Sequence, residues 1–134
     1  MIQRIQSLFL LVAFILNVSF FFLPLYEAAL LDPSAWVTNT LTAALIVAAA
    51  LSLYSIFLFR DRSKQLRFVR LALIMQIVAL GSAVGLFFTM GRITTLWDEA
   101  LGVGILLIAV ICCFLAIRYI QKDEELVRSM DRIR

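Results

Sequence analysis

Long stretches without charged residues alternate with short polar segments along the whole chain. A helix of about 20 residues crosses a hydrocarbon core of about 30 Å, and four of these stretches approach or exceed that length. They lack the alternating pattern of a membrane β-barrel, and a backbone in lipid must satisfy its own hydrogen bonds. The pattern therefore predicts four transmembrane helices, at about residues 5–26, 39–59, 69–91 and 100–119.

The segments between these spans are too short to fold as separate domains. Pro33 and Gly91 lie in two of them, where proline favours a helix start and glycine a helix end. The first stretch is longer than the apolar region of a secretory signal, which has roughly 7 to 15 residues, so we expect a retained span. We predict one domain over residues 1–134, an all-α integral membrane four-helix bundle with up-down-up-down topology.

The composition agrees with lipid as the main solvent. The chain is 63% hydrophobic and 16% charged, whereas a soluble domain is roughly 45 to 50% apolar and about a quarter charged. So few polar residues cannot cover a soluble core. The net charge is +3 and histidine is absent, and no segment can form a solvated basic domain, so we expect no nucleic-acid partner.

The distribution of positive charge predicts the orientation. Every Lys and Arg except Arg92 lies before the first span, in or next to the connection between the second and third, or at and after the end of the fourth. Because positive charge near span ends stays in the cytoplasm, both termini should be cytoplasmic. Trp36 and Trp97 lie on the other side, where their amphipathic rings suit the headgroup region.

The apolar cores of the predicted spans contain no ionisable residue, which disfavours a proton-coupled pump. The lack of histidine removes the commonest metal and haem ligand. Cys112 and Cys113 are adjacent, not spaced as a redox pair, and a disulfide between neighbours would be strained. We therefore expect packing cysteines, no catalytic residue, no metal site, no cofactor and no enzyme activity.

Polar residues within the spans fall into two layers. Asn17 and Ser82 lie about 16 to 18 Å from the cytoplasmic boundary, and Ser52 and Gln76 lie about 8 to 11 Å from it. We expect all four to face the bundle interior, where interhelical hydrogen bonds contribute about 0.6 to 2 kcal/mol. The alternative is a small polar pocket.

Small residues recur at helical spacing in the second and third spans. Ala44 and Ala48 form one stripe, and Gly81 and Gly85 form another. Such stripes allow two helix backbones to approach closely. We expect them to pack these two spans together, with homodimerisation as the alternative.

Two cytoplasmic segments are candidates for external contacts. Residues 60–67 are basic, and each basic residue near the surface attracts anionic lipid by roughly 1 kcal/mol. The candidate headgroup contacts are Arg60, Arg62, Lys64 and Arg67, although the ordinary role of such a cluster is to set topology. Residues 120–134 contain no Gly or Pro, so they can extend the fourth helix into the cytoplasm. Their candidate partner contacts share one helical face: Leu126, Val127, Met130 and Ile133.

The opening segment MIQRIQSLFL and the closing segment KDEELVRSMDRIR resemble a bacterial four-span inner-membrane protein family catalogued only as a domain of unknown function. The resemblance extends over the whole chain and is most specific at these ends. It implies a short multi-pass protein of the bacterial inner (cytoplasmic) membrane. It brings no catalytic residue, ligand or cofactor.

The leading hypothesis is a noncatalytic structural or accessory integral membrane protein whose cytoplasmic tail engages a partner or the lipid surface. The alternative is a small-molecule or lipid-binding or transport bundle with a neutral polar interior. A membrane enzyme ranks third, because no nucleophile or acid/base pair is evident.

Overall fold

The computed structural model describes residues 2–31, 35–90 and 96–133. Within these ranges the chain is all-α, as expected, and contains no strand. The helices are α1 (Ile2–Phe20), α2 (Pro24–Leu30), α3 (Ala35–Phe57), α4 (Arg62–Met90) and α5 (Leu96–Asp131). Pro33, Gly91 and Arg92, which were used to predict connections and orientation, lie outside the described residues.

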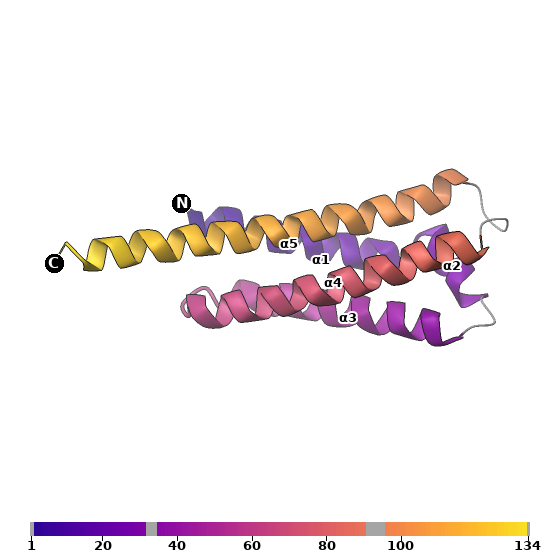
Figure 1. The fold of residues 1–134 in the computed structure, drawn as a ribbon, viewed down its shortest axis with the longest axis horizontal. Coiled ribbons are helices and arrows are strands. Elements are labelled where there is room, and N and C mark those ends of the chain that lie inside the picture. Colours follow the sequence, from indigo (N-terminus) through magenta and orange to yellow (C-terminus); the bar gives the residue numbers. More distant parts are fainter. Residues whose placement is uncertain (1, 32–34, 91–95, 134) are drawn as a thin grey trace.

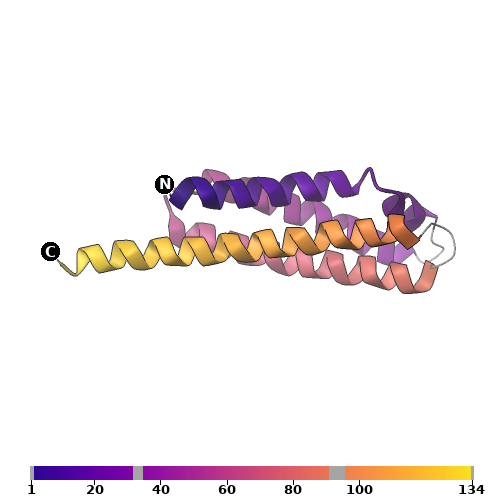
Figure 2. The ribbon, with the colours of Figure 1, turned by 90° about the horizontal axis from the view of Figure 1, so that it is seen from above.

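The four longer helices lie side by side along the long axis, and the short α2 sits at one end (Figures 1 and 2). Successive long helices run in alternating directions (Figure 1). α1 packs against α3 and α5, and α4 packs against the same two helices. This pairing closes a ring of four helices around a shared interior.

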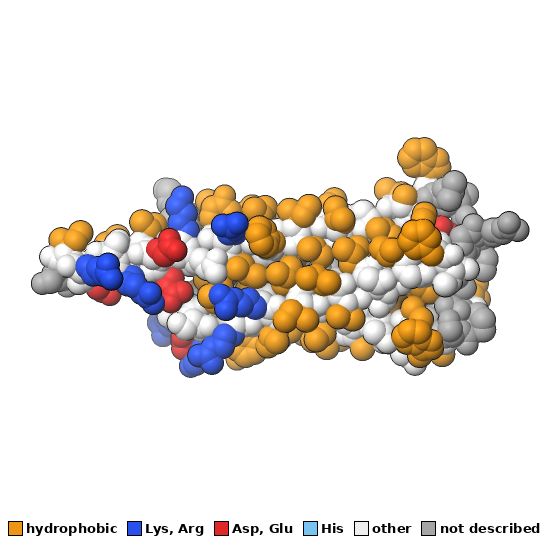
Figure 3. All heavy atoms as spheres, viewed as in Figure 1, with side chains coloured by type: hydrophobic (Ala, Val, Ile, Leu, Met, Phe, Trp, Pro, Cys, Tyr) orange, Lys and Arg blue, Asp and Glu red, His pale blue; other side chains and the backbone are white. Residues whose placement is uncertain are grey.

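Three helices, α3, α4 and α5, are each long and apolar enough to cross a membrane. The helices α1 and α2 would make a fourth crossing if the bent pair counts as one span. Hydrophobic side chains cover most of the face seen in Figure 3, and charged side chains gather toward the end that carries the C-terminus. These features indicate a membrane protein.

The first predicted span is not one continuous helix, which corrects the expectation for residues 5–26. α1 ends at Phe20, α2 begins at Pro24, and the two are bent by 53°. Pro24 causes the break because it lacks an N–H and its ring clashes with the carbonyl four residues earlier, that of Phe20. Leu23, directly before the proline, is extended with φ −90° and ψ 148°.

The buried side chains form clusters at different levels of the interior. The cluster nearest α2 is the largest, with bulky members such as Phe20, Leu41 and Leu86. A second cluster lies at the opposite end and includes Leu10 and Ile120. We call that opposite end the charged end; it holds the start of α1, the turn between α3 and α4, and the last third of α5. α5 continues past it without interruption (Figures 1 and 2).

Candidate functional site

Three polar side chains are completely buried in the middle of the interior. Asn17 on α1, Ser52 on α3 and Gln76 on α4 are each 0% exposed. On each helix, a buried alanine lies one turn earlier on the same face. Ala13 precedes Asn17, Ala48 precedes Ser52 and Ala72 precedes Gln76. The sequence placed these three polar residues in the interior, and the structure brings them there from three different helices.

Two buried glutamines near the charged end provide a contrast with this middle layer. Gln6 Nε2 donates a hydrogen bond to the carbonyl of Tyr119 at 3.1 Å. Gln65 Nε2 donates one to the carbonyl of Ser55, also at 3.1 Å. The amides of Asn17 and Gln76 have no hydrogen-bond partner among the described residues. The described residues therefore satisfy the buried amides near the charged end but not those of Asn17 and Gln76.

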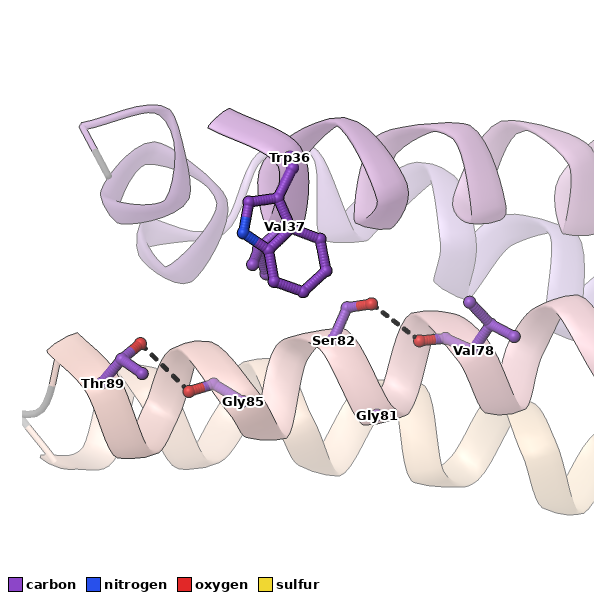
Figure 4. A pocket seen from close by; sticks show the side chains of 7 residues that line it. All are labelled: Trp36, Val37, Val78, Gly81, Ser82, Gly85 and Thr89. Atoms are coloured by element: carbon purple, nitrogen blue, oxygen red, sulfur yellow. Dashed lines mark hydrogen bonds between the residues drawn. The ribbon is translucent and has the colours of Figure 1, made fainter. Parts of the chain in front are cut away.

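Ser82 does not join the interior, which corrects its predicted position. It is partly exposed, and its Oγ donates a hydrogen bond to the carbonyl of Val78 at 2.9 Å. Depth along a helix predicts the level of a side chain but not its direction around the axis, and here Ala79 and Ala83 occupy the inward positions. Ser82 instead lines an outward groove between α3 and α4 of about 510 Å³ (Figure 4).

The two small-residue stripes have different surroundings. Ala44 and Ala48 on α3 are buried. Gly81 and Gly85 on α4 line the groove beneath Trp36 (Figure 4), and a Cβ added at either glycine would meet nothing within 4 Å. The expected close approach of α3 and α4 at these two glycines is therefore wrong. Their side of α4 faces outward.

The glycine that does permit a close approach is Gly102 on α5. A Cβ there would lie 2.6 Å from Cδ2 of Leu25 and 3.0 Å from its Cβ. This contact holds the short helix α2 against α5. Gly102 carried no recognised spacing signal, because its neighbouring glycine, Gly104, is two residues away and not four.

The cysteines lie in the interior as free thiols. Cys112 and Cys113 are both buried, and they cluster with Ala13. Cys113 lies beside Ser52. Among the residues that the structure describes, no group of three or more His, Cys, Asp or Glu is placed to hold a metal ion.

Glu99 is a buried acid directly before the predicted fourth span, and its burial was not expected from the sequence. It is 2% exposed and lies in the first turn of α5. A carboxylate there interacts favourably with the helix dipole. The acidic pair Asp98 and Glu99 at a helix start was the available signal.

The basic residues at the charged end fall into two groups. Arg62 Nε lies 3.1 Å from Asp123 Oδ2, which ties the start of α4 to α5. Lys64 Nζ lies 2.8 Å from Asp61 Oδ2, and its hydrogen bond lowers the pKa of the Asp61 carboxyl. Arg60 and Arg67 are exposed. Two of the four candidate headgroup contacts are therefore already paired with carboxylates of the same chain.

The last turns of α5 expose an apolar face. Leu126 is 41% exposed and Met130 65%, and Val127 lies beside them. Ile133, in the turn that follows α5, is 87% exposed. The nearest ion pair in this segment is weak, with Arg128 Nη2 4.0 Å from Glu124 Oε1. No other described helix reaches this far along the axis (Figures 1 and 2).

Comparison with known proteins gives one match. No curated protein and no solved structure matches the chain significantly. A family described as "Domain of unknown function (DUF4293)" matches residues 2–133, which include the two terminal segments that carried the resemblance. The chain therefore belongs to the DUF4293 family of domains of unknown function.

Proposed function

We propose that this protein is a noncatalytic accessory protein of the bacterial inner membrane that binds a protein partner through the end of α5. The observation that carries the proposal is the apolar face formed by Leu126, Val127 and Met130 on a helix that extends beyond its neighbours, together with Ile133 in the turn directly after it. Exposed apolar residues grouped on one helical face are typical of a protein or membrane interaction site.

The continuity of α5 favours a protein partner over the lipid surface. The helix runs from Leu96 to Asp131 without interruption, so its end keeps the direction of the apolar part that would cross the membrane. With about 1.5 Å of rise per residue, Asp131 lies roughly 16 Å beyond Ile120, the last fully buried residue of α5. A helix that projects away from the bilayer cannot lay its apolar face on the headgroups, as an interfacial helix does.

The proposed arrangement is a four-span bundle with both termini in the cytoplasm. It takes the bent pair α1 and α2 as the first crossing and places the charged end in the cytoplasm. The support is that every Lys and Arg except Arg92 belongs to segments at that end. Arg60 and Arg67, which are exposed there, are available for anionic headgroups.

The test is affinity purification of the full-length protein in mild detergent with two matched variants. Leu126→Asp with Met130→Asp places charges on the apolar face, and Glu125→Gln with Arg132→Gln changes exposed polar residues outside it. We expect a reproducible partner, either another protein or a second copy of this chain. Its recovered amount should fall at least tenfold with the first variant and stay unchanged with the second. Equal recovery with both variants would refute the attachment through α5.

A further inference from the structure

Four buried amide atoms in the middle of the interior have no hydrogen-bond partner among the residues that the structure describes: Oδ1 and Nδ2 of Asn17, and Oε1 and Nε2 of Gln76. Oγ of Ser52, at the neighbouring level, lies beside the Cys113 thiol, which is only a weak hydrogen-bond partner. All three side chains are 0% exposed. They come from α1, α4 and α3, so one helix cannot satisfy them by a local adjustment of its own backbone.

Packing places Ser52 and Asn17 at neighbouring levels. Ala13 of α1 clusters with Cys113 of α5, and Cys113 lies beside Ser52 of α3. Ala13 and Ser52 are therefore at one level. Asn17 follows Ala13 by four residues along α1, so it lies about 6 Å further from the charged end than Ala13 does.

Gln76 lies at the level of Asn17. Leu73 of α4 packs against the cluster that contains Ala13 and Cys113. Gln76 follows Leu73 by three residues, or about 4.5 Å, and α4 runs in the same direction as α1 (Figure 1). Asn17 and Gln76 therefore lie at similar levels of the interior.

Leaving these atoms without partners would be costly. A buried polar group without a hydrogen bond costs about 1 to 3 kcal/mol in proteins, and hydrocarbon around the helices offers no substitute donor or acceptor. Gln6 and Gln65 are almost as deeply buried, yet each donates to a backbone carbonyl. The partner for the middle layer must therefore come from outside the polypeptide or from a direct bond between its own side chains.

The chemistry of the layer defines what such a partner must be. Each side-chain amide can donate hydrogen bonds through its NH2 group and accept them through its carbonyl oxygen, and the serine hydroxyl can also donate and accept. Buried side chains on the same faces of these helices include Ala13, Phe20, Ala48, Ala72 and Ala79, and Cys113 lies beside Ser52. No Asp, Glu, Lys or Arg is among them to balance an ion, so the partner is uncharged.

We propose that Asn17, Ser52 and Gln76 form an internal binding site for a small neutral molecule that both donates and accepts hydrogen bonds, either water or a solute of similar size. Buried water of this kind typically makes about three hydrogen bonds to polar groups that the protein leaves unsatisfied. The site is independent of the apolar face on α5, so either proposal can fail alone.

The test is solid-state NMR of the full-length protein in lipid bilayers, with ¹⁵N labels in Asn and Gln side chains and magnetisation transferred from water. We expect transfer to the amides of Asn17 and Gln76 at least threefold faster than to those of Gln6 and Gln65, which are the matched controls. That result supports bound water. If magnetisation transfer to Asn17 and Gln76 is no faster than to the controls, the bound molecule is not water and must be a solute.

Native mass spectrometry of the protein released from bilayers tests for a solute. A mass increment on the wild type that is lost in Asn17→Leu with Gln76→Leu supports a bound solute, provided circular dichroism shows that the variant keeps its helices. If that variant is not helical, Ser52→Ala replaces it. Two results together would overturn the proposal: transfer from water to Asn17 and Gln76 that is no faster than to the controls, and a wild type without a mass increment. Both results are expected if Asn17 and Gln76 form a hydrogen bond directly with each other.

Discussion

Gln6 and Tyr119, near opposite ends of the sequence, are joined by a hydrogen bond from the Gln6 amide to the Tyr119 carbonyl at 3.1 Å. The aromatic ring of Tyr119 also stacks on Phe9, with ring centroids 5.6 Å apart. Together these contacts set the register of α1 against α5. All the levels inferred for the polar layer depend on that register.

Replacing Gln6 with Leu should lower the free energy of unfolding by about 1 kcal/mol, because the variant keeps the side-chain volume but loses a buried hydrogen bond. The measurement is unfolding of the detergent-solubilised protein by increasing sodium dodecyl sulfate, followed by circular dichroism. Gln121→Leu, at a half-buried position on α5, is the control and should change stability by less. Equal effects would mean that the Gln6 bond contributes nothing specific.

Gly102→Ala should destabilise the protein by about 1 to 3 kcal/mol, because the new methyl group would overlap Leu25 in a packed contact. Gly104→Ala is the matched control on the same helix, where an added Cβ meets nothing within 4 Å. The control should be neutral or stabilising by up to about 1 kcal/mol, since alanine favours helix more than glycine does. The same unfolding assay compares them, and a reversed order would contradict the contact between α2 and α5.

The ion pair between Arg62 and Asp123 should show a coupling energy of about 0.5 to 1 kcal/mol in a double-mutant cycle of Arg62→Gln and Asp123→Asn. The coupling should shrink in 1 M salt, where screening acts over about 3 Å. The more exposed pair Glu124 and Arg128, at 4.0 Å, should give a smaller value. A coupling that is insensitive to salt would argue against an electrostatic origin.

Cysteine labelling should report the orientation of the spans. Ser63→Cys lies at the charged end and Ala100→Cys at the other, and both positions are exposed. In intact cells a membrane-impermeant maleimide should label the second variant and not the first, because the proposed orientation places the charged end in the cytoplasm. The native Cys112 and Cys113 are buried and should stay unlabelled. If the Ser63 variant were labelled instead, the charged end would face the outside of the cell and the proposed orientation would be wrong.

The sequence by itself determined the helical class, the apolar stretches and the location of the charged segments. These properties are local, because a run of uncharged residues around Leu106 or Ala48 is apolar whatever it packs against. The break before Pro24 was not predicted, although proline is known to interrupt a helix at a definite place. The burial of Asn17 and Gln76 followed from the cost of exposing an amide to lipid.

Only the tertiary structure decided which way each helix turns its faces. Ser82 and Asn17 have similar predicted depths, yet one lies on an outward groove and the other in the interior. Gly81 belongs to a recognisable stripe and faces open space, whereas Gly102, which belongs to no such stripe, makes the close contact. The physical reason is that rotation of an apolar helix about its axis changes its own hydropathy very little, so packing against the other helices selects the rotation.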